Sequence, residues 1–191
     1  WGRTTSGSTT CVGIAGGSGV PGVHRSATVS ALTGFSMETH GVLTTTDSVT
    51  GIAVGGGIIT VDVRFRFGSA LPSSAHLTLW CRMGLVNRIA SSPTIERQIG
   101  FTHVFSGSTF LLRGVCRDAS VDVVTTGTFA PTLNQWHHGQ IVINAAGTSV
   151  EFFIDGTSLG VVSSGIPAGV LTEGYIFGTN TAVAEVLQFD I

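Results

Sequence analysis

The sequence contains no lysine and few charged residues of any kind. Its nine basic side chains are all arginine, and charged residues make up only 10% of the 191 positions, against roughly 25% in typical soluble domains. The formal net charge is −2, which argues against a nucleic-acid-binding protein. A surface so poor in charge is typical of a protein that is partly covered within an assembly. Arginine-only usage fits either genomic base composition or selection for interfacial arginines.

Long hydrophobic runs are also missing. The longest apolar runs are far shorter than the about 18 residues of a membrane-spanning helix, so we expect no membrane insertion. Hydrophobic residues nonetheless account for 42% of the chain, enough to bury the core of a single domain. The first residue is Trp1 rather than Met, and we therefore expect a fragment or a processed product of a longer protein.

Cysteine is scarce, with three residues at Cys11, Cys81 and Cys116. Their spacing fits no metal site, and an odd number cannot pair completely within one chain. Each lies within an apolar, strand-like stretch, and free cysteine behaves as a small hydrophobic residue. The sequence therefore favours buried free thiols, and a disulfide between Cys81 and Cys116 stays open as the alternative.

Short alternating stretches separated by turn residues occupy most of the chain, and apolar residues nowhere recur at helical spacing. The clearest alternation lies in Ile58–Phe67 and in His76–Gly84. This pattern predicts an all-β, antiparallel two-sheet β-sandwich over residues 28–191. The Gly/Ser/Thr-rich residues 1–27 form either a linker or an edge strand. Further strands are expected at Thr10–Ala15, Ala27–Leu32, Gly34–Glu38, Glu96–Phe105, Thr109–Arg117, Val121–Thr125, Tyr175–Gly178 and Ala184–Ile191.

Residues 133–160 predict a β-meander. An apolar run at 140–143 precedes a turn, and 150–155 alternates at period two and ends in the strong turn signal Asp155-Gly156. The pattern Asn-x-Trp-His, then an apolar strand, Gly-Thr-x-Val-Glu-Phe-Phe-Ile-Asp-Gly and Leu-Gly, resembles laminin-G-like domains of the concanavalin A-like lectin/glucanase superfamily. It is more narrowly similar to those of phage tail fibres and other virion surface proteins. The resemblance implies a concanavalin A-like jelly roll.

Catalytic motifs are absent, so we expect no enzyme activity. The resemblance implies that a glucanase would carry Glu-x-Asp-x-x-Glu on one strand. Here Glu151 and Asp155 lie four residues apart with no third carboxylate, and Asp155 is explained by its turn. There is also no Gly-x-Ser-x-Gly nucleophile elbow between a strand and a helix.

The sequence predicts no metal site and no cofactor. His137 and His138 are adjacent on a strand and point to opposite faces, so they cannot bind one ion together. Some relatives bind structural calcium, and that possibility stays open here. The candidates are chosen by residue type alone, without a dense cluster to support them: Asp47, Asn87, Asp118 and Asp122.

Arginine and tryptophan side chains occupy the non-core side of three predicted strands. If these strands are neighbours in one sheet, their guanidinium groups surround an indole and form a groove. Such a groove suits a sugar, through ring stacking and bidentate hydrogen bonds, or equally a partner subunit. The alternative is an ordinary solvated face, and Trp136 is expected to pack in the core or against its hairpin. The candidate ligand-binding residues are Arg64, Arg66, Trp80, Arg82, Arg113 and Arg117.

These features predict a non-catalytic module of a virion surface protein, either a phage tail fibre or a capsid decoration protein. Its role would be host-glycan attachment or structural assembly, and its partners would be other virion proteins or copies of itself. A homotrimer is implied by the resemblance alone. The alternative is a carbohydrate-binding module of a secreted carbohydrate-active enzyme.

Overall fold

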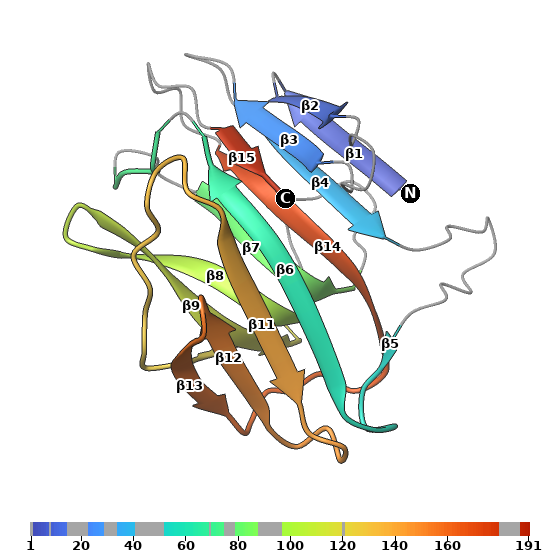
Figure 1. Cartoon of the computed structure of the whole chain (residues 1–191). Coiled ribbons are helices and arrows are strands. Elements are labelled where there is room, and N and C mark those ends of the chain that lie inside the picture. Colours follow the sequence, from blue (N-terminus) through green and yellow to red (C-terminus); the bar gives the residue numbers. More distant parts are fainter. Residues whose placement is uncertain are drawn as a thin grey trace, which may run out of the picture.

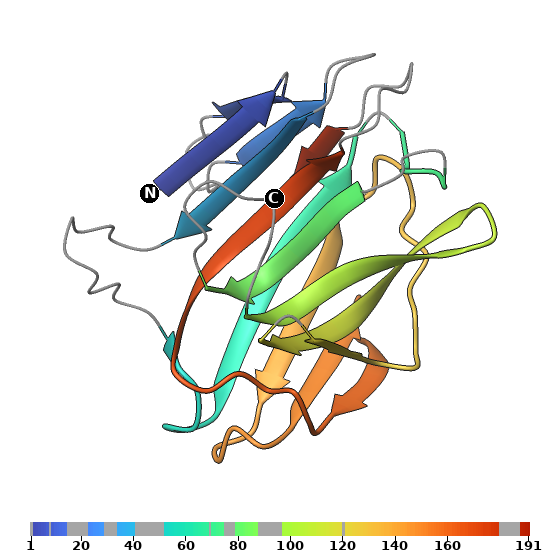
Figure 2. The same ribbon diagram turned by 180° about the vertical axis from the view of Figure 1, so that it is seen from behind.

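Two antiparallel sheets are packed face to face in the computed structural model (Figures 1 and 2). The structure describes residues 2–7, 9–14, 23–28, 34–40, 52–68, 70–74, 79–87, 97–119, 121–179 and 188–191. These residues form fifteen strands and no helix, so none of them belongs to a helix that could cross a membrane. The predicted all-β, antiparallel two-sheet sandwich is therefore confirmed.

The first sheet contains eight strands. Seven of them form a continuous ladder in the order β1 (Gly2–Gly7), β4 (Gly34–His40), β14 (Val170–Thr179), β7 (Leu79–Val86), β8 (Gln98–Ser106), β9 (Thr109–Asp118) and β10 (Val121–Val124). The short β5 (Ile52–Ala53) pairs with the start of β14. Figure 2 shows the β14–β7–β8–β9 part of this sheet in front.

The second sheet contains seven strands and lies in front in Figure 1. Its order is β13 (Thr157–Val162), β12 (Val150–Ile154), β11 (His137–Ile143), β6 (Ile59–Phe67), β15 (Gln188–Asp190), β3 (Val23–Thr28) and β2 (Thr9–Ile14). The meander expected at 133–160 is the β11–β12–β13 end of this sheet.

Several strand boundaries differ from the expected ones. β11 begins at His137 rather than at residue 140, and β14 begins at Val170 rather than at Tyr175. In both cases the added residues include polar side chains or glycine, so they carry no alternation signal. β1, whose sequence GRTTSG has no apolar residue, lies within residues 1–27, for which a linker or an edge strand is expected, and it pairs with β4 at the edge of the first sheet. The end of the expected strand Ala27–Leu32 and the start of Ala184–Ile191 lie outside the described residues.

The core is held between the sheets by aromatic rings that fit over glycines of the opposite sheet. Phe152 of β12 lies against Gly114 of β9, where an added Cβ would come closer than 3.0 Å to the ring. Phe101 of β8 lies in the same way against Gly139 of β11, at 2.7 Å from such a Cβ. The two rings meet edge to face with centroids 5.9 Å apart. Each glycine therefore provides the space for one of the two central rings.

Cys81 and Cys116 are buried free thiols, as the sequence favours. They lie on β7 and β9, which are separated by β8. Two strand spacings amount to about 9.6 Å. This separation exceeds the Cα–Cα distance that a disulfide can span. Burial raises the pKa of each thiol to about 12, with the charge of Arg82 partly opposing the effect at Cys81. The side chain of Cys11 lies outside the described part.

Candidate functional site

The six arginine and tryptophan residues singled out in the sequence do not form one groove. Arg64 and Arg66 belong to β6 of the second sheet. Arg82 belongs to β7 of the first sheet, and Arg113 and Arg117 belong to β9 of the same sheet. The expectation that their strands are neighbours in one sheet is wrong, because alternation shows which side of a strand is polar but not which strand lies next to it. Trp80 lies on β7, and its side chain is outside the described residues.

The outer face of β7, β8 and β9 is partly covered rather than fully solvated. Gln98 and Thr102 are buried on it, at 0% and 3% exposure. Val86 and Val115 are also buried, yet neither belongs to the main hydrophobic core cluster, whose members in these strands alternate with them. Polar and apolar side chains thus share a second buried layer on this face, beneath the arginines.

Arg82, Arg117 and Asp122 form an ion cluster over this layer. The guanidinium group of Arg82 donates to both carboxylate oxygens of Asp122, at 3.3 and 2.7 Å. Arg117 donates to Oδ1 of the same carboxylate at 2.7 Å. The side chains are only 15–27% exposed. Partial burial alone would raise the pKa of Asp122, but the hydrogen bonds and charges of the two arginines outweigh it and hold this pKa below its usual value.

Gln98 connects the ion cluster to the sheet beneath it. Its side-chain oxygen accepts a hydrogen bond from Arg82 at 2.9 Å. Its side-chain nitrogen donates to the carbonyl oxygens of Phe101, at 3.1 Å, and Met83, at 3.4 Å. All the polar atoms of this buried amide are therefore engaged, which fixes the position of the Arg82 guanidinium group.

Gly100 gives Gln98 the room to lie across the sheet, since a Cβ at position 100 would come 3.1 Å from Nε2 of Gln98 and 2.0 Å from the Met83 carbonyl oxygen. Gly84 of β7 pairs with Gly100 and has φ of +124°, which L-residues with a side chain rarely adopt. A Cβ on Gly84 would lie 2.7 Å from the Gly100 Cα atom and 3.0 Å from Cδ1 of Ile141 in the opposite sheet. The two strands therefore approach each other closely at this pair of glycines.

Arg113 lies on the same face and has an unusual environment. It pairs in register with Thr102, which in turn pairs with Arg82. Its Nε atom is buried and has no hydrogen-bond partner among the described residues. A buried N–H of a charged group is costly when unsatisfied, so this atom requires an explanation.

The pKa of His103 is lowered by its burial and by the nearby arginines. Burial lowers its pKa to about 4, and the charges of Arg82 and Arg113 contribute in the same direction, partly opposed by a hydrogen bond to the Cys81 backbone. The ring stacks on Phe110 with centroids 6.1 Å apart. His103 is therefore neutral near pH 7.

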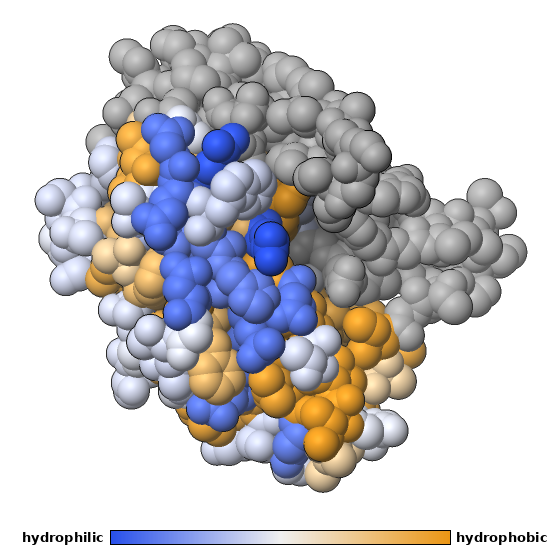
Figure 3. Space-filling view, viewed as in Figure 1, coloured by the Kyte–Doolittle hydropathy of each residue, from blue (hydrophilic) through white to orange (hydrophobic). Residues whose placement is uncertain are grey.

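The outer face of the second sheet is polar along β6 and β11 and hydrophobic near the start of β6 (Figure 3). Asp62 accepts hydrogen bonds from His138 at 2.7 Å and from Gln140 at 3.2 Å. The guanidinium carbon of Arg66 lies 5.1 Å from the ring centroid of Trp136, a cation–π contact. Trp136 is 41% exposed, so of its two expected places, the core or its hairpin, the core is wrong, and its ring contacts Arg66 of the neighbouring β6.

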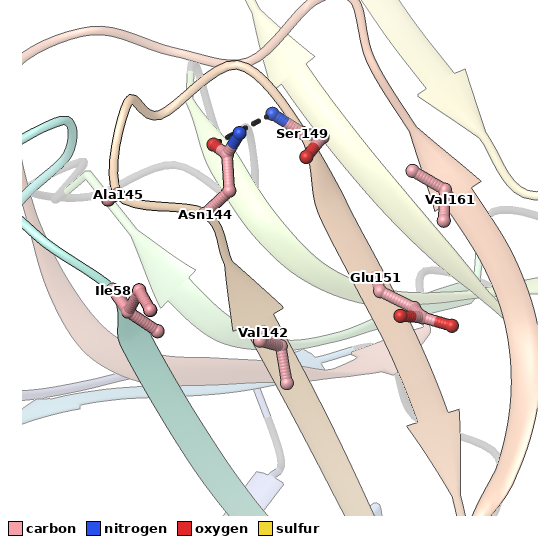
Figure 4. A pocket seen from close by; sticks show the side chains of 7 residues that line it. All are labelled: Ile58, Val142, Asn144, Ala145, Ser149, Glu151 and Val161. Atoms are coloured by element: carbon pink, nitrogen blue, oxygen red, sulfur yellow. Dashed lines mark hydrogen bonds between the residues drawn. The ribbon is translucent and has the colours of Figure 1, made fainter.

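A shallow depression of about 290 Å³ lies at the hydrophobic end of the second sheet (Figure 4). The side chain of Asn144 closes its turn with a hydrogen bond from the Ser149 backbone at 3.1 Å, and Glu151 accepts from the Ser158 hydroxyl at 3.0 Å. The polar groups of the depression are thus engaged in local hydrogen bonds. This makes the depression a weaker candidate than the ion cluster of Arg82, Arg117 and Asp122, which we call the arginine cluster. The lining residues are Ile58, Val142, Asn144, Ala145, Ser149, Glu151 and Val161.

His137 and Asp155 are structural. His137 is 3% exposed, and its Nδ1 atom lies 2.7 Å from Oδ2 of Asp155, while Nε2 accepts from the Thr132 backbone N–H at 3.0 Å. The other Asp155 oxygen accepts from the His138 backbone N–H at 2.8 Å. The two histidines point to opposite faces, as expected. The Trp-His and Asp-Gly parts of the meander pattern are thus joined by one carboxylate.

The described residues contain no group of three or more potential metal ligands. Of the calcium candidates, Asn87 accepts from the Arg97 backbone at 2.8 Å, and Asp118 lies 3.3 Å from the Arg97 side chain. Asp122 is held by the two arginines described above, and Asp47 lies outside the described part. Each described candidate is thus engaged with an arginine residue.

Comparison with known proteins identifies the fold. No family profile and no curated protein sequence matches the chain. Among solved structures, the chain is similar to the globular domain of T. cruzi calreticulin, with a TM-score of 0.57 and 15% identity over 99% of this chain and 82% of that one. The fold is a concanavalin A-like jelly roll.

Two further structures share this jelly roll. The carbohydrate recognition domain of Emp47p has a TM-score of 0.52 and 8% identity, over 99% of this chain and 85% of that one. Endo-β-1,4-glucuronan lyase from the fungus Trichoderma reesei has a TM-score of 0.52 and 12% identity, over 95% and 84% of the two chains. At these identities the likeness establishes the fold alone. The narrower resemblance to laminin-G domains of virion proteins stays a prediction.

Sequence reasoning missed Gln98 and assigned Asp122 a different role. Gln98 is the most buried polar residue of the site. In the sequence, however, nothing distinguishes this glutamine from other polar residues near strand ends. Asp122 is a calcium candidate by residue type, whereas in the structure it binds Arg82 and Arg117. Its place beside Arg117 follows from the β9–β10 hairpin, in which the two residues pair in register.

Proposed function

We propose that this domain is a non-catalytic glycan-binding module and that it binds through the arginine cluster on the outer face of β7–β10. The observation that carries the proposal is the partly buried network of Arg82, Arg117, Asp122 and Gln98. Guanidinium groups that are already fixed by hydrogen bonds can donate to sugar hydroxyls or acidic groups with little loss of side-chain entropy. The carbohydrate recognition domain of Emp47p has the same fold.

The acidic residues of the two faces support a binding role rather than catalysis. A glycoside hydrolase needs one carboxyl group that stays protonated as an acid. Asp122 has a lowered pKa and two arginine partners, and Asp155 is bonded to His137 and His138. Neither is suited to donate a proton. The alternative is a carbohydrate-binding module of a secreted carbohydrate-active enzyme, and a fungal glucuronan lyase is among the solved structures that share the fold.

A glycan array tests this proposal. The wild-type domain is compared with Arg82→Ala/Arg117→Ala and with the matched double variant Arg64→Ala/Arg66→Ala, which removes the same charge from the other sheet. We expect binding that is lost only in the first variant, with all three proteins folded by circular dichroism. Loss only in the second would transfer the site to the β6 face. A folded wild type that binds no glycan would overturn the proposal and favour a structural role in assembly.

The virion-surface setting, with other virion proteins or copies of the chain as partners, remains a prediction of the sequence. A glycan-binding module serves equally at a virion surface and in a secreted enzyme. Sequencing the complete gene distinguishes the two, since a neighbouring catalytic domain would support the second setting.

A further inference from the structure

The turn between β12 and β13 contains the only aspartate of the chain that precedes a glycine, Asp155-Gly156. Such an aspartate can isomerise without an enzyme. The backbone nitrogen of the glycine attacks Cγ of the protonated carboxyl group, a Cγ–O bond breaks, and the oxygen leaves as water with the amide and carboxyl protons. The resulting five-membered succinimide takes up water again and opens to aspartate or isoaspartate. Glycine permits the attack because no side chain shields its nitrogen.

The surroundings of the turn leave room for this reaction. Asp155 and Gly156 are both exposed. A Cβ atom added to Gly156 would meet no atom within 4 Å outside the adjacent residues. The side chain of Asp155 is 35% exposed, so water can reach a succinimide at this position and hydrolyse it. Sequence and exposure alone would therefore make Asp155 a site of rapid isomerisation.

Hydrogen bonds to β11 oppose the reaction. Oδ2 of Asp155 lies 2.7 Å from Nδ1 of His137, and Oδ1 accepts from the backbone N–H of His138 at 2.8 Å. Because Nε2 of His137 accepts from the Thr132 N–H, Nδ1 carries the ring proton and donates to the carboxylate. Succinimide formation removes one of the two oxygens. At least one charge-assisted hydrogen bond must therefore break before the ring can close.

The same hydrogen bonds keep the carboxyl group of Asp155 ionised. Partial burial alone would raise the pKa of Asp155, but the hydrogen bonds from His137 and from the His138 backbone, with the electrostatic effect of both histidines, hold this pKa below its usual value. An oxygen of Cγ leaves as water only after it is protonated. The fold thus opposes isomerisation both by holding the two oxygens in place and by keeping them charged.

We infer that Asp155 is a site of spontaneous isomerisation and that His137 protects it in the folded domain. The site lies apart from the arginine cluster, and the inference does not depend on the proposed glycan binding. Isoaspartate leads the main chain through Cβ and Cγ, which adds one carbon atom to the turn and leaves the free carboxylate on Cα. This carboxylate cannot keep both partners on β11, so isomerisation detaches the turn from the strand.

The test measures isoaspartate in protein that is kept folded at pH 7 and sampled over several weeks. Cleavage after glutamate releases residues 152–173, and electron-transfer mass spectrometry distinguishes isoaspartate from aspartate in this peptide. The wild type is compared with His137→Phe, with His138→Phe and with Gly114→Ala. Wild-type protein unfolded in urea provides the rate of the unprotected chain, and circular dichroism confirms that each variant is folded.

The two histidine variants are matched. In His137→Phe a phenyl ring can keep the contacts with Phe65 and Phe129, but the donor to Oδ2 of Asp155 is lost. In His138→Phe the lost imidazole is the one that binds Asp62 on the exposed face, and the backbone N–H that binds Asp155 remains. The pair therefore isolates the hydrogen bond from the His137 ring.

We expect Asp155 to isomerise at least about tenfold more slowly in the folded wild type than in urea, because unfolding removes both hydrogen bonds. His137→Phe should isomerise at least about fivefold faster than the folded wild type, and His138→Phe should stay within about twofold of it. Gly114→Ala lowers stability by a clash with Phe152 and leaves the turn intact. Its rate should also stay within about twofold, which separates local protection from a general loss of stability.

Four results would overturn the inference. Equal rates in the folded and the unfolded wild type would show that the fold gives no protection, and this comparison needs no variant. Equal rates in the wild type and folded His137→Phe would exclude His137 as the protecting residue. A slower rate in His137→Phe would show that His137 delivers the proton to the leaving oxygen instead. Absence of isoaspartate even in urea would exclude Asp155 as a site of isomerisation.

Discussion

His103 is kept neutral by its surroundings, so we expect it to make stability depend on pH. Burial and two nearby arginines lower its pKa to about 4 in the folded state, against about 6.5 when unfolded. Between these values the unfolded chain binds more protons, so stability falls as the pH falls from about 6.5 to about 4. The loss from this group is on the order of 3 kcal/mol. Urea unfolding at several pH values measures it.

The variant His103→Phe isolates this effect, since a phenyl ring can keep the stacking on Phe110. Its stability should fall clearly less than that of the wild type over the same pH range. Parallel curves for the two proteins between pH 6.5 and 4 would show that another group is responsible.

Asp155 joins two parts of the second sheet through one carboxylate. We expect Asp155→Asn to lower the free energy of unfolding by about 1–3 kcal/mol, because the hydrogen bonds to His137 and to the His138 backbone lose their charged acceptor. Asparagine tolerates the positive φ of 50° at this turn, so the change tests the carboxylate rather than the backbone. Urea unfolding at pH 7 provides the measurement.

The matched control is Asp62→Asn, the same chemical change on the same sheet. The partners of Asp62, His138 and Gln140, are on the exposed face, so the loss should stay below about 1 kcal/mol. Equal losses in the two variants would contradict the structural role of the bond between the buried His137 and the partly exposed Asp155.

The packing of β9 against β12 depends on Gly114, which leaves the space for the Phe152 ring. A methyl group in Gly114→Ala would have to displace this fully buried ring, and we expect a loss of about 2–3 kcal/mol. Phe152→Leu should lower the free energy of unfolding less in the Gly114→Ala variant than in the wild type, because the smaller side chain relieves the clash with the added methyl group. Gly56→Ala, where an added Cβ would meet only the Ala53 carbonyl oxygen at the ordinary contact distance of 3.8 Å, should change stability by less than about 0.5 kcal/mol. Additive effects of the first two substitutions would refute the contact.

Alternation along β6 and β9 identifies the polar side of each strand, and the structure agrees with it: Val61, Val63 and Phe65 are buried, while Asp62 and Arg64 are exposed. Alternation repeats at period two within one strand. It therefore carries no information on which strand pairs with which, or on the sheet to which each belongs. Grouping Arg64 with Arg82 failed for this reason, although both lie on outer faces.

Hairpins are the exception, because short turns force neighbouring strands to pair. The contacts within β11–β12–β13 and between Arg117 and Asp122 follow from such turns. Contacts such as Arg82 with Asp122, 40 residues apart, depend on the order β7–β8–β9–β10 and become visible only once the sheet is assembled.

The molecule as a whole is stabilised by its two-sheet core rather than by cross-links, which makes its buried thiols a measure of global opening. Cys81 and Cys116 are buried on the inner face of the first sheet, and burial raises the pKa of both to about 12. Almost no thiolate is present at neutral pH, and thiolate is the reactive form. In a Cys11→Ser background, we expect a thiol reagent at pH 7.5 to label neither residue until the sandwich unfolds.

Labelling measured by mass spectrometry across a urea series should therefore follow the unfolding transition seen by tryptophan fluorescence, with Cys81 and Cys116 reacting together. The two residues lie on strands separated by β8, so simultaneous reaction requires the whole first sheet to open and supports a single cooperative domain. Labelling of Cys116 well before Cys81 would show that the β9–β10 end opens separately. That end carries Arg113, Arg117 and Asp122, so its independent opening would also mean that the arginine cluster is assembled by the ligand rather than fixed in advance.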